Sequence, residues 1–148
     1  MKEHKTFRIL LADDDDDDAF LFQEALEQIE IKTELQIAEN GMELMKKLDQ
    51  LTETPDFIFL DMNMPVKNGL ECLKEIRSNP KFKEISIAIY STSSSEKDIE
   101  ETFIDGANIY IKKPNDFSKL KKVLKEVVNL NWQFHTSGLN KDTFFFSI

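Results

Sequence analysis

Four groups of polar residues stand at or directly after the ends of apolar runs, and their types suit phosphoryl chemistry. The groups are the aspartates at 13–18 after the first run, Asp61 near the end of the third, Ser91 at the end of the fourth and Lys113 at the end of the fifth. A carboxylate such as that of Asp61 can act as a nucleophile and form an aspartyl phosphate. A serine hydroxyl and a lysine ammonium can then bind phosphoryl oxygens. These residue types predict a site that works by positioning and charge neutralisation.

The acidic residues also predict a site for a divalent cation. Carboxylates a few ångströms apart repel one another, and at an effective dielectric near 20 a close pair costs about 4 kcal/mol. Oxygen ligands favour a hard ion, above all Mg²⁺. Asp13 and Asp14 come first after Ala12, so we expect them to be the metal pair. The aspartates at 15–18 are expected to form a solvated loop and the first turn of a helix, and a metal-binding role for Asp15 is left open.

The periodicity of the chain predicts the scaffold that brings these groups together. Short apolar or β-branched runs indicate strands, and apolar residues at spacings of three and four between them indicate helices. The alternation predicts an α/β fold with a doubly wound, five-stranded parallel sheet and five helices. In such a sheet, ligands bind beyond the carboxyl ends of the strands, where the polar groups lie. The expected strands are 7–12, 34–38, 57–62, 86–91 and 108–113.

Two helix boundaries can also be predicted. The segment 95–105 is expected to be a short helix with Ser95 as its cap and with Gly106 at its end. The last helix is expected to end near Trp132.

The length of 148 residues predicts one main domain. We expect an N-terminal extension at 1–5, the domain at 6–132 and a phenylalanine-rich tail at 133–148. The tail either packs back onto the domain or forms an interface, such as that of a homodimer, because exposed aromatic residues often mark contact surfaces.

Composition and charge argue against nucleic acid and membrane as partners. The formal net charge is −9, which disfavours nucleic-acid binding, because backbone phosphates require a basic face. No apolar run approaches the roughly 20 residues of a membrane span, and the N-terminus lacks the features of a signal peptide. Cys72 is the single cysteine, so it cannot form an internal disulfide. We expect it to be a small packing residue in a protein of the reducing cytoplasm.

Four motifs, taken together, resemble the receiver domain of response regulators in two-component signalling. They are "ILLADDD", "FLDMNMPVKNG", "AIYST" and "IYIKKP", and they occur in this order across residues 7–114. The resemblance is to a stand-alone, chemotaxis-regulator-like receiver. It implies a flavodoxin-like fold, a Mg²⁺ cofactor and a phosphoryl group taken from a phosphohistidine.

The resemblance assigns roles to the acidic residues by position. Asp61 would be the phosphoacceptor and a metal ligand. Asp14 would bind Mg²⁺ directly, and Asp13 would act on the ion through water. Asn63 would offer its backbone carbonyl to the metal.

The resemblance also assigns the groups that respond to the phosphoryl group. Ser91 occupies the position of the switch hydroxyl, and Lys113 matches the lysine before Pro114. Tyr110 matches the aromatic residue of the switch, although a tyrosine on a strand can also be ordinary core packing. The residues that tune the lifetime of the phosphate in this family correspond to Asn63 and Ser93.

The resulting hypothesis is a single-domain response regulator that catalyses only its own phosphorylation and dephosphorylation. Its expected partners are a sensor histidine kinase or a phosphotransfer protein, and a downstream protein. One alternative is a haloacid dehalogenase-like phosphatase, but Asn63 stands where that class needs an acidic residue, and no acidic pair follows Lys113. Another alternative is a receiver-like adaptor that is never phosphorylated, although every position of the predicted phosphoryl site is filled.

Overall fold

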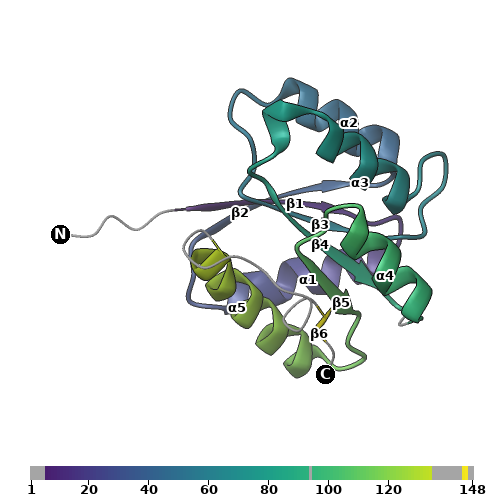
Figure 1. Ribbon diagram of the computed structural model, residues 1–148. Helices are drawn as coiled ribbons and strands as arrows, with labels where there is room; N and C mark the ends of the chain where they lie inside the picture. The colour runs from purple at the N-terminus through teal and green to yellow at the C-terminus, as the bar shows by residue number, and fades with distance from the viewer. Residues whose placement is uncertain (1–5, 94, 135–144, 147–148) are drawn as a thin grey trace.

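A parallel β-sheet forms the middle layer of the protein, as the computed structural model shows for residues 6–93, 95–134 and 145–146 (Figure 1). The strands run in the order β2-β1-β3-β4-β5-β6. Because the order reverses beside β1, the sheet is doubly wound, with a switch point between β1 and β3. The strands are β1 (Phe7–Ala12), β2 (Thr33–Ala38), β3 (Phe57–Leu60), β4 (Ser86–Ser91), β5 (Ile109–Lys112) and β6 (Phe145–Phe146).

Helices cover both faces of this sheet. In the view of Figure 1, α2 (Gly41–Gln50) and α3 (Gly69–Ser78) lie above the sheet, and α1 (Asp16–Gln28) and α5 (Phe117–Phe134) lie below it. The short helix α4 (Glu96–Ile104) packs Ile99 and Phe103 against the same hydrophobic cluster as α2 and α3. The predicted α/β fold of five parallel strands and five helices is confirmed, with β6 as an addition.

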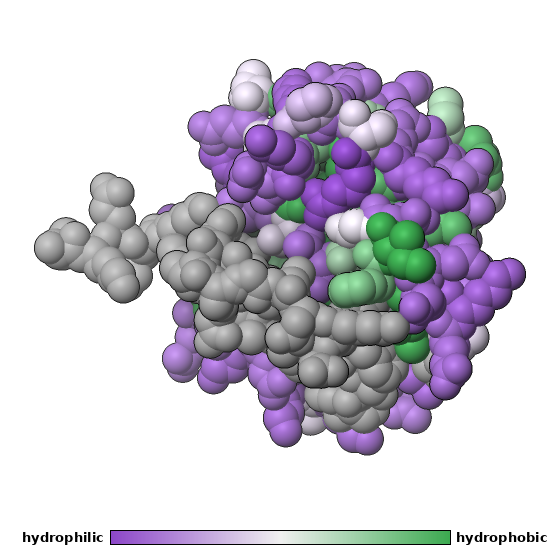
Figure 2. All heavy atoms as spheres, in the orientation of Figure 1, coloured by the Kyte–Doolittle hydropathy of each residue, from purple (hydrophilic) through white to green (hydrophobic). Residues whose placement is uncertain are grey.

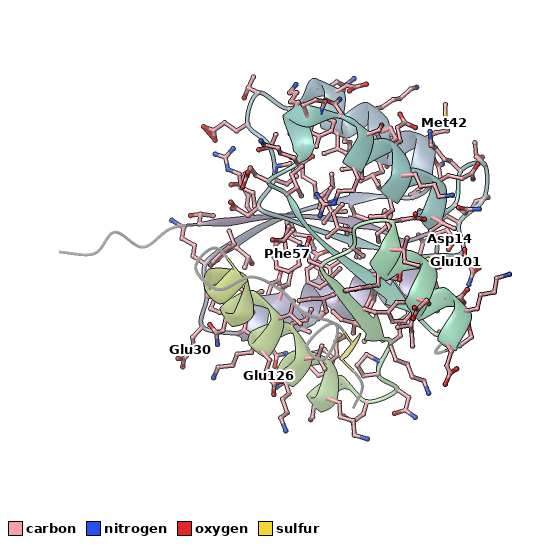
Figure 3. The ribbon with its side chains drawn as sticks, in the orientation of Figure 1. Asp14, Glu30, Met42, Phe57, Glu101 and Glu126 are labelled. Atoms are coloured by element: carbon pink, nitrogen blue, oxygen red, sulfur yellow. The ribbon has the colours of Figure 1, made fainter. Side chains whose placement is uncertain are left out.

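Alternation along the strands divides the core into two clusters. Successive strand residues point to opposite faces, so Phe57 and Phe59 face α1 and α5, whereas Ile58 and Leu60 face α2 and α3. Phe57 points into the interior in Figure 3. Phe22 of α1 meets the ring of Phe59 edge-on, with 4.9 Å between the ring centroids. Both faces of the sheet are therefore buried, as the continuous apolar strands predicted.

The strand and helix boundaries lie close to those expected. β1 and β4 match the predicted bounds, and Ser95 caps α4 by accepting a hydrogen bond from the backbone N–H of Asp98. β3 ends at Leu60 rather than at residue 62. The reason is local, because the Asp61 carboxylate accepts a hydrogen bond from the backbone N–H of Asn63 and turns the chain out of the sheet.

The C-terminal part of the chain departs from expectation in two ways. α5 ends at Phe134, near the expected Trp132 but two residues inside the predicted tail. The strand β6 pairs with β5 in parallel, so that Phe145 lies opposite Tyr110 and Phe146 lies opposite Ile111. Residues 135–144 of the predicted tail and the predicted extension at 1–5 lie outside the described residues, and the proposed domain boundaries remain predictions.

Cys72 is a buried packing residue of α3, as expected. Its thiol lies 3.7 Å from the carbonyl oxygen of Gly41 at the start of α2. Burial raises the pKa of this thiol to about 11, so it is protonated at neutral pH. Since the thiolate is the reactive form, Cys72 is chemically inert in the folded protein.

Arg77, near the end of α3, ties two loops together, the one before β4 and the one before β5. Its guanidinium donates to the carbonyl oxygen of Gly106 at 2.8 Å and to the Asn108 side-chain oxygen at 2.7 Å. A further, longer hydrogen bond reaches the carbonyl oxygen of Lys83 at 3.4 Å. The same Asn108 oxygen accepts the backbone N–H of Ile87 at 2.8 Å. Arg77 therefore fixes the start of β5 against β4 and α3.

Replacing Arg77 with alanine is expected to lower the free energy of unfolding by about 2–3 kcal/mol, because several partly buried oxygen atoms lose a charged donor. Urea denaturation measures the change. Lys74→Ala is the matched control, since Lys74 lies on the same helix, is exposed and approaches Asp105 only at 3.9 Å. Equal, small changes in the two variants would contradict a stabilising role for Arg77.

The surface of the described residues is mostly hydrophilic on the face shown in Figure 2, where hydrophobic residues appear in small groups. Among the described residues, no helix has both the length and the apolar character that crossing a membrane requires. Exposed large hydrophobic residues in the described part of the chain include Phe20, Leu21, Met42, Val66 and Ile104.

Candidate functional site

The carboxyl ends of β1, β3, β4 and β5 meet at one edge of the sheet and bring the predicted polar residues together. Asp13 follows β1, Asp61 follows β3, Ser91 ends β4 and Lys113 follows β5. Figure 3 shows Asp14 at this edge, on the same side of the molecule as α4, whereas Glu30 beyond the end of α1 lies at the opposite side. Residues up to 100 positions apart in sequence thus share one site.

Three carboxylates form an acidic cluster at this edge. One oxygen from each of Asp13, Asp14 and Asp61 lies within 4.8 Å of the others, with Asp13 and Asp61 buried and Asp14 exposed. Burial raises the pKa of Asp13 to about 6, despite the lowering effects of the Asp15 backbone N–H and the Lys113 ammonium. The donor set consists of oxygen atoms only and is partly open to solvent, so it fits a hard divalent cation such as Mg²⁺.

Lys113 lies at the centre of the negative charge. Its Nζ donates to Asp13 at 3.0 Å, to Asp18 at 3.0 Å and to Asp61 at 3.4 Å, and its side chain is only 8% exposed. Burial lowers the pKa of Lys113, but the three carboxylates outweigh that effect and raise the pKa above its ordinary value. The ammonium also lies 5.2 Å from the ring centroid of Tyr90. Lys113 therefore remains a protonated, fixed cation beside Asp61.

The aspartates at 13–18 have different structural roles at the start of α1. The Asp13 carboxylate accepts the backbone N–H of Asp15 at 3.0 Å. Asp15 is the N-cap, and its carboxylate accepts the backbone N–H groups of Asp17 and Asp18 at 3.0 and 3.1 Å. Asp15 therefore caps α1 through one carboxylate oxygen, and it is not among the three carboxylates of the acidic cluster. Asp18 lies in the first turn of α1, as expected, but it is only partly solvated, because its carboxylate contacts the Lys113 ammonium.

The loop after Asp61 is held in place by local hydrogen bonds and close packing. Asn63 lies exposed in this loop, next to the Asp61 carboxylate that its N–H contacts. Asn68 and Glu71 form a reciprocal capping box at the start of α3. A Cβ atom at Gly69 would lie 2.3 Å from the backbone oxygen of Asp61, so only glycine fits there without moving that residue. The loop therefore holds the Asp61 carboxylate in a defined position.

Ser91 at the end of β4 and Tyr110 of β5 both form hydrogen bonds with Ser93, in the loop between β4 and α4. Ser91 is buried, and its Oγ accepts the backbone N–H of Ser93 at 3.1 Å. Tyr110 is fully buried, and its hydroxyl donates to the carbonyl oxygen of Ser93 at 2.9 Å. The Ser93 hydroxyl in turn donates to Asp98 of α4 at 2.7 Å. A chain of hydrogen bonds thus connects the end of β4 with β5 and α4.

Sequence reasoning missed two members of this arrangement, Asp18 and Asp98. A signal for Asp18 was present, because Asp18 precedes the buried Phe22 by four positions and so lies on the inward face of α1. For Asp98 no comparable signal exists, since its contact depends on how the loop before α4 folds.

Known proteins share both the sequence pattern and the fold. The sequence model of one protein family, the response regulator receiver domain, matches residues 9–125 of this chain. The response regulator Rcp1 of Synechocystis sp. is 35% identical over 124 residues, which cover 80% of this chain and 84% of Rcp1. The chain belongs to the response-regulator receiver family. The chemotaxis protein CheY1 of Helicobacter pylori is 33% identical and is matched over 98% of its length, with 84% of this receiver covered.

Many solved structures are similar to this receiver, and two response regulators, RcpA and Rcp1, are among them. The phosphorylated cyanobacterial phytochrome response regulator RcpA superimposes with a TM-score of 0.80 at 34% identity, covering 91% of this receiver and 99% of RcpA. The Mn²⁺-bound form of Rcp1 gives a TM-score of 0.75 at 32% identity, covering 90% and 99% of the two chains.

Family membership establishes the general function. The protein is a receiver-domain response regulator of two-component signalling, and neither the phosphatase nor the unphosphorylated adaptor is favoured. Receiver domains bind Mg²⁺ or Mn²⁺ at an acidic pocket, and this receiver has an acidic cluster at the corresponding edge of the sheet. Proteins of this family signal through histidine kinases or downstream proteins and are usually not enzymes in the ordinary sense.

Proposed function

We propose that this receiver accepts a phosphoryl group on Asp61 from the phosphohistidine of a sensor kinase or phosphotransfer protein, and then binds a downstream protein. The observation that carries the proposal is the position of the Asp61 carboxylate. It lies within 4.8 Å of the carboxylate oxygens of Asp13 and Asp14, and 3.4 Å from the ammonium of Lys113. A nucleophile, a cation-binding cluster and a fixed positive charge thus converge on one point.

Four residues would hold the metal ion in this proposal. Asp14 and Asp61 would bind it through their carboxylates and Asn63 through its backbone carbonyl, and the Asp13 carboxylate would act on it through water. A bound Mg²⁺ would neutralise charge that develops on the phosphoryl oxygens during transfer.

The residues of the chain would carry out the transfer by positioning. An oxygen of the Asp61 carboxylate forms a bond to phosphorus while the bond from phosphorus to the histidine nitrogen breaks, and that nitrogen keeps the electron pair. The Asn63 N–H holds one Asp61 oxygen, and Lys113 lies beside the other. After transfer, Lys113 and Ser91 would bind two of the phosphoryl oxygens.

The change in partner binding would begin at Ser91. A shift of Ser91 towards the phosphoryl group disturbs its hydrogen bond to Ser93, which also binds Tyr110 and Asp98. The surface of α4, β5 and α5 is therefore the proposed switching face. This face would have two conformations, and the contacts that the phosphoryl group makes with Ser91 and Lys113 would favour one of them.

Incubation with a small phosphodonor tests the function directly. In the presence of Mg²⁺, radiolabelled acetyl phosphate is expected to label the protein, and EDTA is expected to prevent labelling. The label should be released by hydroxylamine, because an aspartyl phosphate is an acyl phosphate. Labelling that survives EDTA or hydroxylamine would contradict the proposal.

The raised pKa of Asp13 predicts a pH dependence of metal binding. Mg²⁺ binds the carboxylate form, so a proton competes with the metal once the pH falls through the pKa of about 6. The apparent affinity for Mg²⁺ is expected to be constant above pH 7. Below pH 6 it is expected to decrease with falling pH, and the decrease approaches about tenfold for each pH unit. Calorimetric titrations at pH 5, 6 and 7.5 measure this change.

The Asp13→Asn variant provides the control for the pH dependence. It should bind Mg²⁺ more weakly and with a flatter pH profile, because the titrating group is absent. An affinity of the unmodified protein that stays constant from pH 7.5 to pH 5 would contradict the role given to Asp13.

The proposal also covers the partners, the oligomeric state and the location of the protein. The net charge of −9 supports protein partners rather than nucleic acid. A homodimer, a cytoplasmic location and a domain spanning 6–132 remain parts of the hypothesis. The only reactions catalysed would be the receiver's own phosphorylation and dephosphorylation.

A further inference from the structure

The ammonium of Lys113 has no spare proton for a phosphoryl group. A lysine ammonium has three N–H donors. Here the three carboxylates of Asp13, Asp18 and Asp61 lie 3.0, 3.0 and 3.4 Å from Nζ. A bond from Lys113 to a phosphoryl oxygen therefore requires that one of these contacts opens or is shared.

Asp13 and Asp18 hold Lys113 more closely than Asp61 does, and of these two Asp18 is the partner that Lys113 can leave at lower cost. The Asp13 side chain is fully buried and forms part of the acidic cluster, and Asp61 carries the phosphoryl group itself. The Asp18 side chain is 35% exposed, so water can hydrate its carboxylate after Lys113 moves away. It also adds one negative charge beside a site that must accept an anion.

We propose that Asp18 is a positioning residue that holds Lys113 while Asp61 is unphosphorylated and competes with the phosphoryl group for the same ammonium. This inference rests on the proposed function of Asp61. Its consequence is that Asp18 slows phosphorylation, because Lys113 must exchange one charged partner for another.

Three variants separate this competition from the general effect of charge. Asp18→Asn keeps the shape of the side chain and removes the charge that binds Lys113. Asp17→Asn makes the same charge change one position earlier in α1, where the side chain is exposed. Asp18→Glu keeps a carboxylate on the same face of the helix. Circular dichroism and thermal unfolding confirm that each variant is folded.

The experiment measures the rate constant of labelling by radiolabelled acetyl phosphate at saturating Mg²⁺. Asp18→Asn is expected to be labelled at least about threefold faster than the unmodified protein, because a charged acceptor is replaced by a weaker neutral one. Asp17→Asn is expected to stay within about twofold of the unmodified protein. Asp18→Glu keeps a carboxylate that can contact Lys113, so it is expected to be labelled more slowly than Asp18→Asn.

A second measurement requires no substitution. In the unmodified protein with Mg²⁺, the phosphoryl mimic beryllofluoride is expected to shift the ¹³C carboxyl resonance of Asp18, as Lys113 leaves it. The resonance of Asp17 is expected to move far less. An Asp18 resonance that stays in place would overturn the proposal even if the Asp18 variants did not fold.

The outcomes also separate this inference from the function on which it rests. If the unmodified protein is labelled but Asp18→Asn is equal to Asp17→Asn, or slower than the unmodified protein, the competition is wrong and the function stands. If the unmodified protein takes up no label, both are overturned.

Discussion

Replacing Asp61 with asparagine is expected to reduce the rate of labelling by acetyl phosphate by at least about 1,000-fold, because the nucleophilic oxygen becomes part of a neutral amide. The substitution changes little in shape, and the amide oxygen can still accept the hydrogen bond from the Asn63 N–H that holds the loop. The folded structure should therefore persist while transfer is lost.

Asp49→Asn is the matched control for Asp61→Asn. Asp49 lies exposed on α2, so the substitution makes the same change in net charge away from the site. Its labelling rate should remain within about twofold of the unmodified protein. If Asp61→Asn were labelled as fast as Asp49→Asn, Asp61 would be ruled out as the phosphoacceptor.

Replacing Lys113 with methionine is expected to lower the free energy of unfolding by about 3 kcal/mol at pH 7 without Mg²⁺, because it leaves buried carboxylates without their cation. Asp13 and Asp61 are buried beside the ammonium, and the methionine side chain fills a similar space. Saturating Mg²⁺ should restore part of the stability, since the ion supplies positive charge at the same cluster. Labelling should slow by about 100-fold, because a charged donor to the phosphoryl oxygens is lost.

The neighbouring lysine provides the comparison for Lys113→Met. Lys112 is exposed, so Lys112→Met should change the free energy of unfolding by no more than about 0.5 kcal/mol. Urea denaturation with and without Mg²⁺ measures both variants. If the two variants were equally stable under both conditions, the compensating role of Lys113 would be wrong.

Much of the fold follows from local pattern alone. The run from Phe7 to Ala12 is continuously apolar apart from one exposed arginine, so both the strand and its limits can be predicted. The position of the site follows as well, because parallel strands align their carboxyl ends. Asp13, Asp61 and Lys113 were predictable for this reason, each standing directly after such a strand.

The contacts that were not predictable join distant parts of the chain. Asp18 and Lys113 are 95 positions apart, and their contact depends on which face α1 turns towards the end of β5 in the folded protein. The bond between Arg77 and Asn108 likewise depends on the packing of α3 beside the loop before β5. The pairing of β6 with β5 involves a strand of only two residues, too short for a periodic signal.

The buried state of Cys72 makes this receiver convenient for site-specific spectroscopy. Maleimide reagents attack thiolates, and the raised pKa of about 11 leaves almost none at this position at neutral pH. A cysteine introduced on the surface therefore becomes the one reactive thiol, with no need to remove the native residue first. Ile104 at the end of α4 is 71% exposed, so Ile104→Cys would place a fluorophore or spin label beside the proposed switching face.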